Sequence, residues 1–238
     1  LGRWITIAVD PIEEISCRRT LKDTKETNPF EILRNLDSGH WTGWLSYEAG
    51  AWTEPSNHWK IDSMATLWIA SHDPILKFDL HKKEVWIEGL NKARVNKFEN
   101  LLNNYQIEPN KKKSTTCHHV HKKKIGIPLK NWEWLTTKDE YARDVNKIKQ
   151  LIQQGDIFQA NLSACCQAQL PQDISALDIY FNLRESSPSP FSGLIVGKDS
   201  TAGEAVISSS PERFLKVLPT GEVETRPIKG TRPRNNNP

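Results

Sequence analysis

Lys229 lies in a basic segment without acidic residues, RPIKGTRPR, at positions 226–234. A lysine acts as a nucleophile only in its neutral form, so its pKa must be lowered from about 10.4 by burial or by neighbouring positive charge. Arg226, Arg232 and Arg234 could supply that charge, or could bind carboxylates through their planar guanidinium groups. The segment therefore has the residue types of a nucleophilic site or of a carboxylate-binding site.

Seventeen positions before Lys229, the segment SSSPERF supplies three hydroxyl groups and then Glu212 and Arg213. Gly230, next to the lysine, would let a substrate approach the backbone closely. The alternative is that Lys229 is an exposed strand-end residue and that Glu212 and Arg213 form a surface ion pair, worth less than about 1 kcal/mol. Composition and periodicity alone favour this alternative.

The composition limits the class of protein. The chain has 238 residues, 37% hydrophobic and 26% charged, and a formal net charge of +3. This small charge argues against a nucleic-acid-binding protein, and no apolar run approaches the roughly 18–20 residues that cross a bilayer. The 4 cysteines form no CxxC pair, so we expect neither a disulfide framework nor a zinc knuckle, and a cytoplasmic location.

The elements that must position the basic segment are predicted after the middle of the chain. Residues 137–155 form an amphipathic pattern with a capping box, which predicts a helix. Residues 156–170 alternate with period two, which predicts a strand whose polar face includes Gln159. A second helix is predicted at 174–188. Strands are then predicted in SPFSGLIVG, EAVISSSPERFLKV and EVETRPIKG, antiparallel where the turns between them are short.

The first part of the chain predicts short strands and one helix. The helix is expected at 28–39, because Asn28 and Pro29 form a start signal and a glycine follows the last apolar position. Aromatic and apolar runs predict buried strands at 41–50 and 64–73, and residues 75–89 predict a hairpin.

Two lysine triplets and little apolar periodicity predict a solvated linker between these parts. We therefore expect an N-terminal lobe at 1–110, a basic linker at 111–130 and the start of a second domain at 131–238.

Four segments occur in the order and spacing of motifs of the chorismate-utilising enzymes: GDIFQANLS (155–163), SPFSG (189–193), ISSSPERF (207–214) and TRPIKGT (225–231). The chain resembles this family, which contains anthranilate, aminodeoxychorismate, isochorismate and salicylate synthases. The resemblance implies an α+β fold in which large, mostly antiparallel β-sheets pack face to face with helices outside. It also implies that the chain is a fragment lacking the C-terminal half of the family's fold.

Two positions distinguish the branches of the family. Gln159 stands where the branches that add water have a lysine, so the resemblance implies a branch that adds ammonia. Lys229 stands where anthranilate synthases typically have alanine, and "PIKGT" resembles component I of aminodeoxychorismate synthase, an enzyme of para-aminobenzoate and folate synthesis. The alternatives are anthranilate synthase component I and a truncated, non-catalytic module that binds an effector or a partner.

The resemblance also implies roles for individual residues. Lys229 would be the nucleophile that attacks chorismate, and Glu212 would be the general acid and base. The expected substrate-binding residues are Gln159, Arg226, Gly230 and Thr231.

The family's regulatory site and its accessory components give further expectations. Part of the rim of its tryptophan pocket matches Pro190, Phe191 and Ser192, so these are expected to bind an effector. Mg²⁺ is the expected cofactor, with its glutamate ligands in the C-terminal half, so no metal site is expected in this chain. A glutamine amidotransferase subunit is the expected partner, because the sequence has no glutaminase motif of its own.

Overall fold

The computed structural model describes residues 2–18, 27–56, 59, 63–104 and 131–228. The first part of the chain forms two antiparallel sheets of three strands each, in the spatial orders β1-β5-β6 and β2-β4-β3. Their strands are β1 (Trp4–Ala8), β2 (Glu13–Cys17), β3 (His40–Leu45), β4 (Leu67–His72), β5 (Ile75–Asp79) and β6 (Glu84–Glu88). The hairpin and the buried strand predicted at 64–73 are therefore confirmed, whereas the strand predicted at 41–50 ends at Leu45 and has only Trp44 buried.

The hydrophobic core lies around β4, every residue of which is buried. Trp44 of β3 stacks on Trp68 of β4 with ring centroids 4.9 Å apart, and its indole N–H donates to the carbonyl of Ala65 at 3.0 Å. Ile195 and Val206, from the second half of the chain, pack against this cluster. The core therefore joins the N-terminal sheets to the sheet that carries the SPFSG and SSSPERF motifs.

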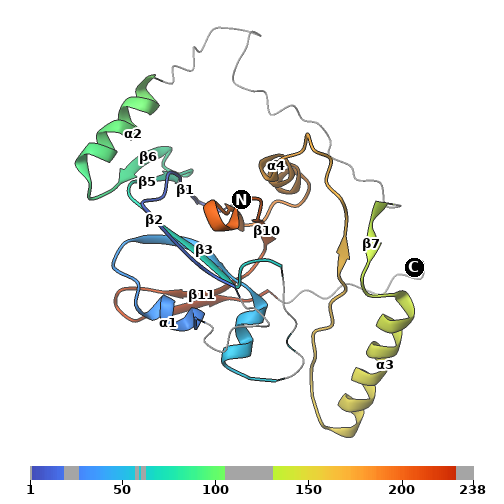
Figure 1. Cartoon of the computed structure of the whole chain (residues 1–238). Helices are drawn as coiled ribbons and strands as arrows, with labels where there is room; N and C mark the ends of the chain where they lie inside the picture. The colour runs from blue at the N-terminus through green and yellow to red at the C-terminus, as the bar shows by residue number, and fades with distance from the viewer. Residues whose placement is uncertain (1, 19–26, 57–58, 60–62, 105–130, 229–238) are drawn as a thin grey trace.

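The second half supplies that sheet and a hairpin. Strands β9 (Phe191–Val196) and β10 (Ala205–Ser210) pair antiparallel, as do β11 (Arg213–Val217) and β12 (Val223–Arg226). Helix α4 (Ala176–Ser186) begins with a capping box of Ser175 and Asp178 and packs against β9 and β10 (Figure 1). The structure confirms the predicted α+β fold of antiparallel sheets with helices outside, although the described sheets have only two or three strands each.

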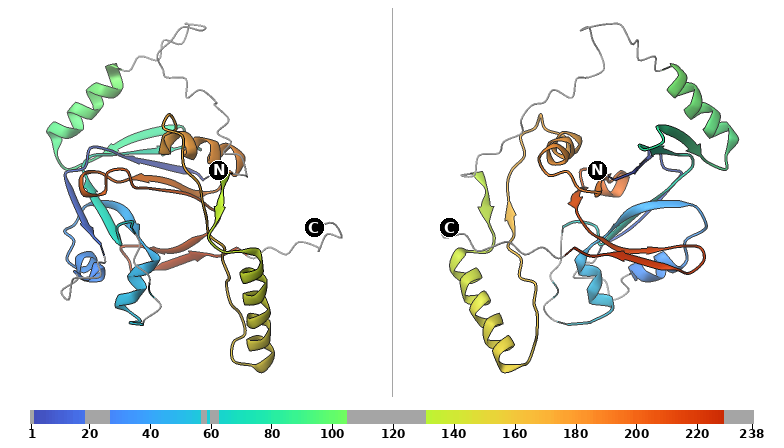
Figure 2. Two further views of the ribbon diagram at one scale, coloured as in Figure 1. Left: turned by 45° about the vertical axis from the view of Figure 1, so that its right-hand side comes forward. Right: turned by 180° about the vertical axis from the view of Figure 1, so that it is seen from behind.

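Helix α3 (Lys138–Gln154) confirms the predicted capping box of Thr137 and Glu140, and Gly155 closes it in the left-handed conformation at φ 84°. Both views in Figure 2 show α3 standing apart from the sheets, next to the short pair β7 (Glu133–Trp134) and β8 (Cys166–Gln167). None of the helix's residues is buried. Its apolar face is therefore only partly covered by the described residues.

Several predicted elements were wrong in extent. Only Cys166 and Gln167 of the strand predicted at 156–170 pair with another strand, and Phe158 is 91% exposed. A strand needs a hydrogen-bonded neighbour, and β7 is the only neighbour that this segment has in the described part of the chain. Helix α1 (Pro29–Arg34) ends earlier than the predicted 39, because Asn35 already forms its C-terminal cap.

The structure also contains one α-helix and two 3₁₀ helices that the sequence patterns did not predict. Helix α2 (Lys92–Asn104) follows β6, and the 3₁₀ helices η1 (Tyr47–Trp52) and η3 (Asp199–Thr201) interrupt segments expected to be extended or looped. The linker predicted at 111–130 lies outside the described residues. None of the helices in the described part is long and apolar enough to cross a membrane.

Asp79 closes the β5–β6 hairpin and is expected to matter for stability. Its side chain is 1% exposed and accepts hydrogen bonds from Arg3 Nε at 2.9 Å and from the backbone N–H groups of His81 and Lys82. The hydrogen bonds from Arg3 hold the pKa of Asp79 far below its usual range, so its contribution to stability is present above the unfolded-state pKa and is lost as the pH falls through the folded-state pKa.

Asp79→Asn is therefore expected to lower the melting temperature at pH 7 by several degrees, because a charged acceptor is lost inside the structure. Thermal unfolding followed by circular dichroism measures this, with the exposed Asp37→Asn as the control. Equal melting temperatures for the two variants would contradict the assignment.

Candidate active site

The hairpin β11–β12 brings the SSSPERF and TRPIKGT segments together. Its turn contains Gly221 at φ 85°, a conformation that favours glycine. The antiparallel register places Arg213 opposite Arg226 at the open end of the hairpin. Glu212 directly precedes β11, and Pro227 and Ile228, which lead to Lys229 in the sequence, directly follow β12.

The carboxylate of Glu212 is tied to the segment that leads to Lys229. Its Oε1 accepts a hydrogen bond from the backbone N–H of Ile228 at 2.8 Å. Ser210 Oγ donates to the Glu212 carbonyl at 2.9 Å and accepts from the Glu212 N–H at 3.2 Å, which fixes the turn before β11. The glutamate is exposed and has a second carboxylate oxygen, so it can exchange a proton with a bound substrate. Lys229, Gly230 and Thr231 themselves lie outside the described residues.

Arg226 is paired within the hairpin. Its Nε lies 2.8 Å from Glu224 Oε1 and its Nη2 3.1 Å from Glu224 Oε2. The hydrogen bond from Arg226 and the positive charges of Arg226 and Arg213 hold the pKa of Glu224 below its usual value, although burial acts in the opposite direction. The Arg226 side chain is 61% exposed, so part of its guanidinium group still faces solvent. Its predicted role in substrate binding stays a prediction.

Gln159 lies in the extended segment between α3 and β8, and its side chain is exposed. Most of this segment is not paired into a sheet, so the described structure does not bring Gln159 into the hairpin site. Its predicted role in substrate binding also stays a prediction.

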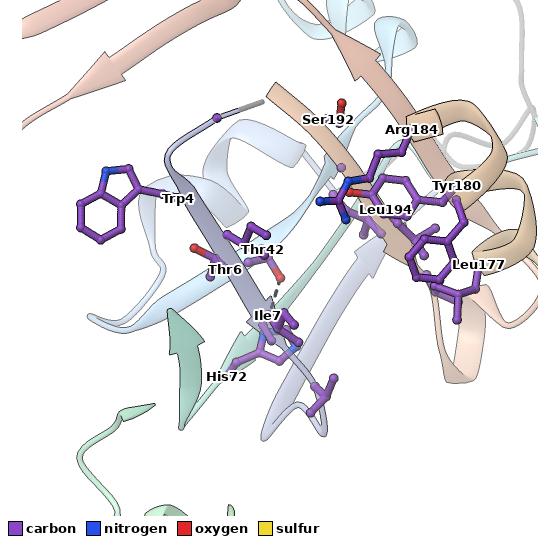
Figure 3. A pocket seen from close by; sticks show the side chains of 18 of the residues that line it. Trp4, Thr6, Ile7, Thr42, His72, Leu177, Tyr180, Arg184, Ser192 and Leu194 are labelled. Carbon is purple, nitrogen blue, oxygen red and sulfur yellow. Dashed lines mark hydrogen bonds between the residues drawn. The ribbon is translucent and has the colours of Figure 1, made fainter. Parts of the chain in front are cut away.

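A separate cavity of about 770 Å³ lies between β1, β9 and α4 (Figure 3). Pro190 and Ser192, two of the three residues expected to bind an effector, line it. The third, Phe191, instead stacks with Arg213, whose Cζ lies 4.7 Å from the ring centroid. The first residue of β9 therefore contacts the β11–β12 hairpin, whereas the residues that follow it line the cavity.

The polar residues of the cavity come from segments far apart in the sequence. Figure 3 shows Thr6 of β1, Thr42 and His72 on one side, and Tyr180 and Arg184 of α4 on the other. None of these was predicted, because no motif joins a strand near the N-terminus to a helix more than 160 positions later. The helix predicted at 174–188 was the only signal, and a predicted helix does not indicate a cavity beside it.

His72, at the wall of this cavity, is expected to make stability depend on pH. Its side chain is buried, Thr42 Oγ1 lies 3.4 Å from its Nδ1, and burial lowers its pKa from the ordinary 6.5. Below about pH 6.5 the unfolded chain therefore binds a proton that the folded chain does not, so stability falls as the pH falls.

The melting temperature is expected to drop less between pH 7.5 and pH 5.5 in His72→Gln than in the unsubstituted protein, because the variant lacks this titrating group. Scanning calorimetry at the two pH values measures this. His81→Gln, which removes an exposed histidine, is the control and should retain the full drop. A drop in His72→Gln as large as in the control would contradict the prediction.

The described residues contain no group of three or more histidine, cysteine, aspartate or glutamate side chains placed to hold a metal ion. Glu212 and Glu224, the acidic residues nearest the open end of the hairpin, are engaged by Ile228 and by arginines.

Comparison with known proteins gives one family match across almost the whole chain. The model of the chorismate-binding enzymes matches residues 2–238. An anthranilate synthase component I-like protein of Synechocystis sp. is 31% identical over 202 residues, which cover 84% of this chain and 38% of that protein. The crystal structure of anthranilate synthase component I from Streptococcus pneumoniae TIGR4 superposes with a TM-score of 0.66 at 18% identity, covering 92% of this chain and 52% of that one.

Relatives that are named for different activities match at similar levels. Aminodeoxychorismate synthase component 1 of Salmonella typhimurium is 36% identical over 107 residues, which cover 45% of this chain and 22% of that protein. Anthranilate synthase component 1 of Bacillus pumilus is 38% identical over 97 residues, which cover 41% of this chain and 18% of that protein. The matches thus span less than half the length of these relatives, and overall identity does not separate the two activities.

Proposed function

Because the chain belongs to the chorismate-binding enzyme family, we propose that the full-length product of its gene is component I of an aminodeoxychorismate synthase. The reaction would replace the 4-hydroxyl group of chorismate with an amino group. One observation carries the proposal: Ile228 N–H donates to Glu212 at 2.8 Å, so a carboxylate is held one residue from the lysine of the "PIKGT" motif. A proton-transfer group and an amine nucleophile would then act on one substrate.

In the first step, the neutral amine of Lys229 attacks ring carbon 2 of chorismate. The ring double bonds shift, the bond from carbon 4 to its hydroxyl breaks, and Glu212 protonates the departing group, which leaves as water. In the second step, ammonia attacks carbon 4, the double bonds shift back and the bond between carbon 2 and Lys229 breaks. Glu212, now a carboxylate, takes a proton from the incoming ammonia. Two displacements through a covalent intermediate replace one difficult substitution.

The remaining residues have supporting roles in this proposal. Arg226, Gly230 and Thr231 would contact the substrate, the arginine through the part of its guanidinium group that Glu224 leaves free. Because position 159 is glutamine, the site would have no base there to activate water, and ammonia would be the nucleophile. The ammonia would come from a glutamine amidotransferase partner. The Mg²⁺ that chemistry of this kind uses to hold carboxylates would have to be bound by residues other than those described.

Anthranilate synthase component I is the second candidate, because an anthranilate synthase component 1 matches this chain as well as an aminodeoxychorismate synthase component 1 does. The two candidates differ in product. Chorismate, Mg²⁺ and ammonium are incubated with the full-length protein, and the products are separated by chromatography. Aminodeoxychorismate would support the first proposal, and anthranilate would support the second and overturn the first.

We also propose that the cavity between β1, β9 and α4 binds an effector, since Pro190 and Ser192 line it. Tryptophan is the first compound to test, by isothermal titration. Leu194→Trp, which fills the cavity from the β9 side (Figure 3), is expected to abolish binding. Equal binding by the variant and the unsubstituted protein would place the effector elsewhere.

A further inference from the structure

Arg213 contacts two different strands at the candidate active site. It follows Glu212 in the chain, its Nη1 forms an ion pair with Glu224 of β12, and its Cζ lies 4.7 Å from the ring centroid of Phe191 in β9. Its side chain is only 26% exposed. A guanidinium group is planar and has several N–H donors, so it can stack on a ring and pair with a carboxylate at the same time.

The register of the hairpin explains why Arg213 pairs with Glu224. Arg213 and Arg226 are direct antiparallel partners, and like charges placed opposite each other destabilise a strand pair. Glu224 neutralises both, because its carboxylate accepts hydrogen bonds from Arg213 and from Arg226. Thr225 Oγ1 also donates to the Arg213 carbonyl at 3.3 Å. The open end of the hairpin, from which Glu212 and the "PIKGT" segment emerge, is thus held together around Arg213.

The rest of the hairpin is loosely placed on the described part of the molecule. Its large apolar residues are mostly solvent-exposed, as shown by Phe214 at 86%, Val217 at 64% and Val223 at 63%. The contact of Arg213 with Phe191 therefore acts together with the short turn between Ser210 and Arg213 in orienting the hairpin relative to the β9–β10 sheet.

We propose that Arg213 is a positioning residue, which orients Glu212 and the segment that follows Arg226 by stacking on Phe191 while it pairs with Glu224. This inference rests on the proposed function, in which Glu212 and Lys229 act on one substrate. Lysine could keep the ion pair but could not stack as a flat group, so arginine is specifically required at position 213. Displacement of a catalytic group by about 1 Å can lower a rate by about a hundredfold.

The test is a double-mutant cycle in the full-length protein with Arg213→Lys and Phe191→Leu. Each single variant is expected to lower kcat by about tenfold to a hundredfold, with the KM for chorismate changed by no more than about twofold. Because both variants break the same stack, the double variant should be no worse than the poorer single variant. Phe191→Tyr keeps the aromatic ring, so it should retain most of the activity that Phe191→Leu loses.

Arg34→Lys is the matched control, because Arg34 pairs with Glu31 on the surface of α1 and has no part in the site. It should leave kcat unchanged. Three outcomes would overturn the inference: an unchanged kcat in Arg213→Lys, a raised KM with unchanged kcat, or effects of the two single variants that multiply in the double variant. The last would mean that Arg213 does not act through Phe191.

A second measurement separates this inference from the proposed function. Hydrogen exchange of the amides from Val223 to Ile228 should be faster in both Arg213→Lys and Phe191→Leu than in the unsubstituted protein. Unchanged exchange in either variant overturns the inference. If the unsubstituted protein forms no aminodeoxychorismate, the proposed function fails, and faster exchange would still support the positioning role.

Discussion

Lys229→Ala is expected to abolish aminodeoxychorismate formation, lowering kcat by at least about a thousandfold, as removal of a nucleophile commonly does. Without the amine, no group attacks carbon 2 of chorismate, so ammonia would have to displace the hydroxyl group directly. The product formed from chorismate, ammonium and Mg²⁺ by the full-length protein is quantified by chromatography.

The control for this variant is Lys216→Ala, which removes an exposed lysine from β11 of the same hairpin. It is expected to keep kcat within about twofold, because the proposed mechanism gives this side chain no task. Activity of Lys229→Ala within tenfold of the unsubstituted protein would mean that Lys229 is not the nucleophile. Formation of anthranilate by both proteins would in addition assign the chain to the other branch of the family.

Glu212→Gln is expected to lower kcat by about 10² to 10⁴, the range typical of a general acid or base. Glutamine keeps a side-chain oxygen that can accept the hydrogen bond from Ile228, so the backbone next to Lys229 should stay in place. Glutamine can neither protonate the departing hydroxyl group nor take a proton from the incoming ammonia. The variant therefore isolates proton transfer from positioning.

Steady-state kinetics as a function of pH measures this second effect. The kcat of Glu212→Gln should stay low at every pH tested, while the KM for chorismate changes little. Glu222→Gln, in the exposed turn of the same hairpin, is the control and should match the unsubstituted protein. A kcat of Glu212→Gln close to that of this control would remove Glu212 from the mechanism.

Local signals in the sequence were sufficient for much of the fold. The capping box of Thr137 and Glu140 and the glycine at position 155 placed both ends of α3, because these groups satisfy the free backbone N–H and C=O groups of a helix end. The turn at Gly221 likewise predicted the β11–β12 hairpin. Both features depend only on residues close together in the chain.

The failures occurred where structure depends on distant partners. The alternation at 156–170 is that of a strand, but the described residues supply only β7 as a neighbour, so two residues pair and Gln159 stays exposed. Helix α2 was missed because its apolar positions are few and none of its residues is buried. The spacing of apolar residues predicts which face of a helix or strand is apolar. It does not predict whether another element covers that face.

The candidate site was predictable in part. The motifs gave Glu212 and Lys229, and the hairpin that the turn predicts brings their segments together. The stack of Arg213 on Phe191 and the cavity beside β9 could not be predicted, because both need the packing of strands that are separate in the sequence. Phe191 was expected to bind an effector with its neighbours, yet its ring contacts Arg213 of the hairpin instead.

The central claim is that Lys229 forms a covalent bond with chorismate, and intact-protein mass spectrometry tests it most directly. The full-length protein is incubated with chorismate and Mg²⁺, with ammonia and glutamine left out so that the second displacement cannot occur. We expect a mass increase equal to chorismate less one water, located at Lys229 by peptide mapping and missing in Lys229→Ala. An active protein that shows no such adduct, or that carries it on another residue, would contradict the mechanism.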